Sequence, residues 1–182
     1  MRRIITMVVF LLIFSPVLNA EDEAPEIPEI VSTLMTNERI AALIDKLDED
    51  AEGRPGFWRF QLDEYEVYVI TDERAGRMRA MVPILPSAEV ELETFERLMQ
   101  ANFDSALDAR YSIANDTLWA TFIHPLTSLS DELLISGIAQ SVNLAATYGT
   151  TFNSGALVFN GGDSAEQQRN YYQDIIDRAN AI

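Results

Sequence analysis

Three consecutive segments between residues 57 and 85 alternate apolar and polar side chains, and this alternation constrains the fold more than any other feature. In residues 57–63, Trp58, Phe60 and Leu62 share one face of an extended chain, and polar side chains share the other. Residues 65–71 and 77–85 repeat the pattern. A period of two with one polar face is typical of an antiparallel sheet that packs on a core with one face only. The short connections between the segments predict consecutive hairpins.

Helical spacing of apolar residues predicts helices before and after these strands in the sequence. The first helix is expected over residues 37–50 with Thr36 as its cap, and the third over residues 131–148 with Ser130 as its cap. The second is expected over residues 88–103 with Ser87 as its cap. Its expected inward-facing residues are Phe95, Leu98, Met99 and Phe103. A last helix begins at Ser164, and its expected packing residues are Tyr172, Ile175, Ile176 and Ala179.

Two further strands, residues 110–114 and 117–124, flank Asn115-Asp116, a pair that suits a two-residue hairpin turn. Residues 156–159 are either an edge strand or a packed loop. The predicted fold class is therefore α+β: a twisted antiparallel five-stranded sheet with helices packed on it. The element order is α-β-β-β-α-β-β-α plus a C-terminal helix.

Residues 1–20 have the order of a secretory signal peptide. Arg2 and Arg3 precede a short apolar run, and Ala20 supplies a small residue before an acidic segment. The run is shorter than the roughly 20 residues that a membrane span needs. We expect cleavage after Ala20, export to the periplasm of a bacterium and no stable membrane anchor after cleavage. The alternatives are an extracellular location and an uncleaved N-terminal anchor.

The chain is strongly acidic and contains no cysteine. Its formal net charge is −16, and removal of residues 1–20, with two arginines and no acidic residue, makes it −18. Such a surface repels phosphate groups, so nucleic acid is not an expected partner. Without cysteine, disulfides, thiolate metal sites and cysteine nucleophiles are excluded.

No motif in the sequence indicates catalysis. His124 is the only histidine, and a position beside Pro125 at a strand end favours a structural role. Acidic pairs such as Glu64 and Glu66, Asp72 and Glu73, or Asp131 and Glu132 are expected by chance in a chain with 29 acidic residues. We predict no catalytic, cofactor-binding or metal-binding residue and no enzyme activity. A hydrolase that uses two carboxylates is the weakest alternative.

One strand has large apolar side chains on both faces, which suggests a binding surface. In residues 117–124, Leu118, Ala120 and Phe122 share one face, and Trp119, Thr121 and Ile123 share the other. The helices cover one of these faces, so the other either contacts a partner or is itself covered. The candidate partner-binding residues are Tyr68, Trp119, Thr121 and Ile123.

Several short motifs in the same order resemble the YbjN-like family and the small type III secretion chaperones of the Tir-chaperone type. They are Trp58-Arg59-Phe60, Gly76-Arg77-Met78-Arg79, Pro83-Ile84, Leu98-Met99-Gln100-Ala101-Asn102-Phe103, Ala109-Arg110-Tyr111-Ser112-Ile113, Leu118-Trp119, His124-Pro125-Leu126 and Tyr148-Gly149. The resemblance implies an α+β fold without cofactor or catalytic residues. It also implies a dimer that holds an extended segment of a partner protein along grooves and strand edges.

These observations give four regions and a leading hypothesis. The regions are a signal peptide (residues 1–20), a flexible acidic leader (21–33), a YbjN- or secretion-chaperone-like domain (34–159) and a C-terminal helical extension (160–182). The leading hypothesis is an exported, non-enzymatic protein-binding module, chaperone-like in character, with an unidentified protein partner and self-association into a homodimer. The alternative is an exported protein that binds a small molecule or lipid between sheet and helices.

Overall fold

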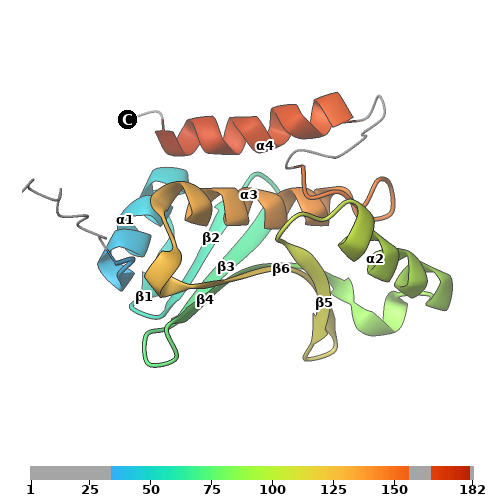
Figure 1. The fold of residues 1–182 in the computed structure, drawn as a ribbon, viewed down its shortest axis with the longest axis horizontal. Coiled ribbons are helices and arrows are strands. Elements are labelled where there is room, and N and C mark those ends of the chain that lie inside the picture. The colour runs from blue at the N-terminus through green and yellow to red at the C-terminus, as the bar shows by residue number, and fades with distance from the viewer. Residues whose placement is uncertain (1–33, 156–164, 181–182) are drawn as a thin grey trace, which may run out of the picture. The chain divides into compact units, whose positions relative to one another are not determined.

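The computed structural model describes residues 34–155 and 165–180, all within one compact unit that spans residues 33–182 (Figure 1). The predicted residues 156–159 and Ser164 lie outside the described residues. The helices are α1 (Asn37–Leu47), α2 (Leu92–Asp104), α3 (Asp131–Ala146) and α4 (Ala165–Asn180). The strands are β1 (Glu52–Arg54), β2 (Phe57–Leu62), β3 (Tyr65–Asp72), β4 (Arg77–Pro86), β5 (Arg110–Ala114) and β6 (Thr117–Pro125).

The strands form one antiparallel sheet in the order β1-β2-β3-β4-β6-β5. The α+β class, the antiparallel pairing and the three predicted hairpins are confirmed. The prediction of five strands is wrong, because the described part of the chain contains six. The missed strand is β1, where Gly53 lies against Trp58: a Cβ on Gly53 would come within 2.4 Å of the indole ring. In the sequence Gly53 indicates the end of a helix, but in the structure it lets the edge strand pack closely against the Trp58 ring.

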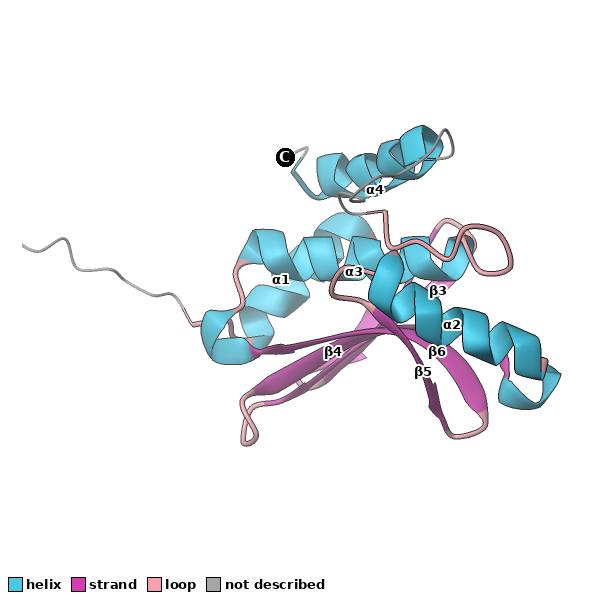
Figure 2. Ribbon diagram, turned by 45° about the vertical axis from the view of Figure 1, so that its right-hand side comes forward, coloured by secondary structure: helices cyan, strands magenta, loops and turns pink. Residues whose placement is uncertain are grey.

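The helices α1, α3 and α4 lie on one side of the sheet, and α2 lies beside its β5 end (Figures 1 and 2). Helix α3 contacts β3, β4, β5 and β6, while α4 contacts α3 and α1. Because α3 lies between the sheet and α4, it is buried nearly all round, including Gln140 and Asn143. The predicted packing of α4 is confirmed, since Ile175 and Ala179 are buried and Tyr172 and Ile176 pack against the core.

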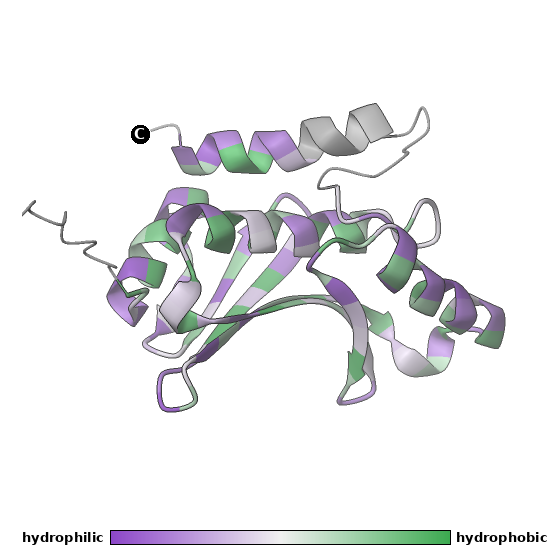
Figure 3. Ribbon diagram, viewed as in Figure 1, coloured by the Kyte–Doolittle hydropathy of each residue, from purple (hydrophilic) through white to green (hydrophobic). Residues whose placement is uncertain are grey.

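Alternating side chains build the core on the helix-covered face of the sheet. Hydropathy alternates along the strands in Figure 3, and the buried positions are those that point toward the helices. Phe122 of β6 illustrates the close fit, because a Cβ on Gly137 of α3 would come within 2.4 Å of its ring. The caps predicted at Thr36 and Ser130 are confirmed by hydrogen bonds from the Arg39 and Leu133 amides, both 3.2 Å long.

Helix α2 differs from its prediction in start and orientation. Ser87 begins a short 3-10 turn, Ser87–Glu89, and the α-helix begins only at Leu92. Leu98 is buried and Phe95 is partly buried as expected, but Met99 is 57% exposed and Phe103 is 90% exposed. The physical reason is position: α2 contacts β5 at the end of the sheet and is covered on one side only.

No helix in the described ranges 34–155 and 165–180 is both long enough and apolar enough to cross a membrane.

Candidate functional site: a groove on the open sheet face

The sheet face opposite the helices carries the side chains that the core does not use. Antiparallel register sets them in rows across the strands. One row runs Phe57, Ile70, Arg79 and Ile123; the next runs Arg59, Tyr68, Met81, Thr121 and Arg110. Neighbouring strands lie about 4.8 Å apart, so adjacent members of a row lie within side-chain contact. The open face therefore mixes large apolar groups with arginines.

A hollow of about 470 Å³ lies on this face, and we call it the sheet groove. Three of the four predicted partner-binding residues, Trp119, Thr121 and Ile123, line it together with Ile70, Arg79 and Met81. Tyr68 borders the groove, since its ring meets that of Trp119 edge-on with centroids 6.0 Å apart. The structure thus places the four residues side by side. Ile123 is 46% exposed, although β6 lies inside the sheet between β4 and β5.

Ring contacts and one hydrogen bond hold the aromatic side of the groove in place. The rings of Phe57 and Tyr68 also have centroids 6.0 Å apart, which extends the aromatic row to three members. The indole Nε1 of Trp119 donates to the Ala114 carbonyl over 2.9 Å, across the β5–β6 hairpin. Trp119 thereby keeps its ring orientation without a partner, so the groove is preorganised.

An acidic side chain fixes the polar end of Tyr68. The Tyr68 hydroxyl donates to Glu66, and this hydrogen bond raises the pKa of Tyr68. Arg59 pairs with Glu66 at 3.6 Å and with Glu52 on the edge strand. Tyr68 therefore stays protonated in neutral and mildly alkaline solution, and Arg59 is already neutralised by its neighbours.

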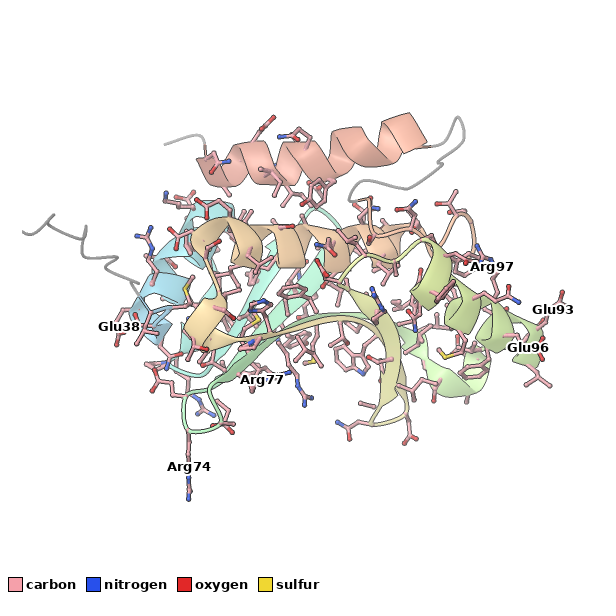
Figure 4. All side chains as sticks on the ribbon, in the orientation of Figure 1. Glu38, Arg74, Arg77, Glu93, Glu96 and Arg97 are labelled. Carbon is pink, nitrogen blue, oxygen red and sulfur yellow. The ribbon has the colours of Figure 1, made fainter. Side chains whose placement is uncertain are left out.

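Two other arginines of the open face are not paired in this way, although Asp72 of β3 lies opposite Arg77 in register. Arg77 and Arg79 are exposed, and neither makes an ion pair with any described residue. Arg79 also borders a second hollow of about 420 Å³, which shares Ile70 and Ile123 with the first and reaches Arg77. Figure 4 shows Arg77 on the side of the sheet away from α3. One end of the sheet groove is therefore cationic in an acidic protein.

The sheet edges offer little to an added strand. On β5, the Asn102 side chain accepts from the Tyr111 amide over 2.7 Å and donates to the Tyr111 carbonyl over 3.1 Å. The Gln140 side chain accepts from the Asp108 and Ala109 amides just before β5. At the other edge, β1 is three residues long and is followed by Pro55. Side-chain amides and short length are common protections of an edge strand.

Asp131, a member of one acidic pair, and His124 have structural partners. Asp131 pairs with Arg39, and this hydrogen bond lowers the pKa of Asp131, opposite to what a general acid needs. His124 stacks on Phe122 with a centroid distance of 5.8 Å, and its Nδ1 lies 2.9 Å from the Pro125 carbonyl oxygen. Among the described residues, no group of three or more histidines or acidic residues is arranged to hold a metal ion.

A second apolar surface was not predicted from the sequence. Leu92, Met99 and Phe103 lie one above another on the outer face of α2 and are 78%, 57% and 90% exposed. We call these three residues the α2 stripe. The sequence interpretation assigned Met99 and Phe103 to the core because of their helical spacing, and it made no assignment for Leu92. Periodicity identifies an apolar face but does not show what covers it.

Comparisons with known proteins reveal similarity at the level of solved structures. No family model matches the sequence, and no curated protein matches it. A chain of the HopA1–SchA chaperone–effector complex is 14% identical, with 60% of this chain and 91% of that chain covered at a TM-score of 0.45. A chain of the Yersinia pestis complex between the type III secretion chaperone SycH and a YscM2 fragment is 18% identical (65% and 98% covered, TM-score 0.46). A chain of the ExsC–ExsE complex is 16% identical (72% and 96% covered, TM-score 0.45). These likenesses are distant, and the proposals below rest on the sheet groove and the α2 stripe.

Proposed function

We propose that this protein is a non-enzymatic protein-binding module, chaperone-like in character, that holds a segment of another protein in the sheet groove. The observation that carries the proposal is a preformed hollow that is lined by the exposed Ile123 and by Trp119 and is bordered by Tyr68. Exposed apolar groups lower the free energy of the system when a partner removes them from water. The polar rim, including Arg79, would then position the partner.

Site-specific photo-crosslinking in the native cell tests this function. A photoreactive phenylalanine analogue replaces Ile123 in the groove, and a matched variant carries it at Glu49, an exposed position after α1. We expect a discrete protein adduct from position 123 and none from position 49, with the partner identified by mass spectrometry. Adducts of equal yield from both positions, or none from position 123, contradict the proposal.

We further propose that the protein acts after export, with residues 1–20 removed. The charge, apolar core and small-residue order of that segment supports this location. Fractionation of cells followed by N-terminal sequencing is the direct test. A chain that begins at Glu21 in the periplasmic or extracellular fraction supports export, and a full-length chain in the cytosol contradicts it.

Self-association into a homodimer is the third part of the proposal, and the α2 stripe supports it. Phe103 is 90% exposed, and a monomer would leave this ring almost entirely in water. A twofold dimer brings the same stripe of two copies together, so one helix face supplies both halves of the interface. The mass in solution tests this, and the Discussion gives the variant that should abolish it.

A small-molecule site is the second candidate, and one hollow favours it. This hollow measures about 320 Å³ and lies between α1, α3 and α4 instead of between sheet and helices. It is lined by apolar groups such as Leu43 and Ile135 and by Tyr172, whose hydroxyl lies 2.6 Å from the Ser136 hydroxyl. Its volume is at the lower end for a ligand pocket. Native mass spectrometry of the purified protein should reveal a bound compound, and an apo mass alone contradicts this candidate.

A further inference from the structure

We infer that the sheet groove selects an extended protein segment whose carboxylates alternate with other residues and are followed by an apolar side chain. This inference rests on the proposed protein-binding function and names the chemistry of the partner. It also states how the partner is bound: through its side chains across the open face, and not as an added strand at an edge of the sheet.

The first step is charge. The chain is acidic overall, with a formal net charge of −16, yet the open face carries several arginines. They are Arg54, Arg59, Arg77, Arg79 and Arg110, and the acidic residues on the same face are Glu52, Glu66 and Asp72. Arg59 is paired with Glu52 and Glu66, and the Arg110 guanidinium donates to the Ala106 and Ala109 carbonyls. Arg77 and Arg79 make no ion pair within the described residues. Two exposed guanidinium groups side by side are complementary to carboxylates, which they bind through paired hydrogen bonds.

The second step is spacing along β4. Arg77, Arg79 and Met81 are alternate residues of one strand, so their side chains leave the same face at intervals of about 6.8 Å. An extended peptide has the same spacing between its own alternate side chains. A segment that runs along β4 therefore presents an acid to Arg77, an acid to Arg79 and an apolar group to Met81.

The third step is the apolar surroundings of those arginines. Arg79 lies in register between Ile70 of β3 and Ile123 of β6. Met81 lies between Tyr68 of β3 and Thr121 of β6, and the rings of Tyr68 and Trp119 meet across β4. A carboxylate bound at Arg79 would be flanked by apolar groups that exclude water and strengthen the charge-assisted hydrogen bonds. An apolar side chain beside Met81 would pack against the aromatic row.

The fourth step is the closure of the sheet edges. The Tyr111 amide and carbonyl on β5 are both bonded to Asn102, and β1 has only three residues. Strand addition requires a row of open backbone groups, which these edges do not provide. The face supplies side chains only, so selectivity depends on the charge and apolar character of the partner's side chains.

Synthetic peptides test this chemistry. In the first, two glutamates and an isoleucine occupy alternate positions with threonines between them; in the second, the same residues are reordered so that the glutamates are adjacent. The third replaces the glutamates with lysines. Fluorescence anisotropy measures the binding of each to the purified chain that begins at Glu21. We expect the alternating peptide to bind about tenfold or more tightly than the reordered peptide, and the lysine peptide not to bind.

Charge reversal in the groove supplies the matched protein variants. R77E/R79E should weaken binding of the alternating peptide by about tenfold or more and should allow the lysine peptide to bind. K46E/R74E makes the same change in net charge at exposed positions away from the open face: Lys46 lies in the last turn of α1, and Figure 4 shows Arg74 pointing away from the sheet. It should leave binding within about twofold. Circular dichroism checks that both variants fold.

The outcomes separate this inference from the proposed function. Equal loss in the two double variants, or equal binding of all three peptides, overturns the partner chemistry. If the crosslink from position 123 persists in R77E/R79E, the protein-binding function stands and the carboxylate preference is wrong. If neither a crosslink from position 123 nor any peptide binding is found, the function itself fails. Binding of the lysine peptide to R77E/R79E, but not to the wild type, supports the inference directly.

Discussion

The sheet groove and the α2 stripe are both apolar surfaces in water, but they differ in shape and in charge. The groove is recessed, its rings are held by contacts among Tyr68, Trp119 and Phe57, and arginines lie along it. The stripe stands on the outside of a helix, and Phe103 is almost fully exposed. Figure 4 shows Glu93 and Glu96 projecting from the same helix. One surface is preorganised and cationic, and the other is protruding and acidic.

The difference indicates two kinds of partner. A recessed surface with fixed rings and free cations is suited to a segment of opposite charge, because shape and charge both select it. A protruding apolar stripe is suited to a second apolar surface, and a copy of the same chain provides one by symmetry. Changes in one surface should therefore affect one activity and leave the other intact.

The largest effect is expected from removal of the α2 stripe. Each buried aromatic or methionine side chain contributes about 1.5–3 kcal/mol, and a twofold interface contains each of them twice. M99S/F103S should therefore raise the dimer dissociation constant by about a hundredfold or more without changing groove binding. Analytical ultracentrifugation measures the change. The control is L34S, which alters a residue that is 58% exposed and lies outside the stripe. A wild-type protein that is monomeric at millimolar concentration would contradict the prediction.

The next effect concerns Asn102, which joins α2 to β5. The substitution N102A removes the partner of both Tyr111 backbone groups, and unsatisfied backbone groups cost about 1–3 kcal/mol. Urea denaturation should show this loss in the free energy of unfolding. N102D keeps an acceptor for the amide but sets a carboxylate oxygen against the carbonyl oxygen, so it should not restore the stability of the wild type. Equal stability of N102A and wild type would show that Asn102 does not fix α2 to β5.

A smaller effect is expected from the aromatic row. W119A removes the ring that meets Tyr68 and should weaken binding of the alternating peptide by about tenfold, since aromatic anchors dominate many interfaces. The dimer dissociation constant should not change. W119F retains a ring without the hydrogen bond to Ala114 and should lie between wild type and W119A. Peptide titration by anisotropy distinguishes the three proteins, and an unchanged W119A would exclude Trp119 from the binding surface.

Much of the fold could be predicted because local chemistry determines it. Alternation located the strands β2, β3, β4, β5 and β6 to within a residue or two at their ends. Asn115 and Asp116 adopt the positive φ angles of 51° and 57° that a two-residue hairpin requires. Thr36 and Ser130 cap their helices as expected. The candidate groove residues on β6 followed from the alternation of its side chains between two faces, since only one of these faces could meet the helices.

The features that were missed depend on long-range packing. Gly53 belongs to a strand because Trp58 lies directly against it, and no local signal indicates that contact. Met99 and Phe103 have core-like spacing, but α2 lies at the end of the sheet, where no other described element covers them. The row of Ile70, Arg79 and Ile123 depends on the register of β3, β4 and β6, and α2 and β5 separate β4 from β6 in the sequence. Alternation along a strand shows which face of the sheet a side chain occupies, and the register between strands determines which side chains lie next to it.

Ionic strength should produce the smallest effect, and it should act on the two surfaces in opposite directions. Groove binding depends on attraction between arginines and carboxylates, which salt screens over a Debye length of about 10 Å at 0.1 M. Raising sodium chloride from about 0.05 M to about 0.5 M should weaken the alternating peptide several-fold. Dimerisation brings two acidic helices together, so the same change should strengthen it by reducing repulsion around Glu93 and Glu96. Parallel anisotropy and sedimentation series measure both trends in one buffer system. Salt responses of the same sign would mean that the two surfaces do not differ in electrostatic character. The sheet groove and the α2 stripe would then differ in shape alone.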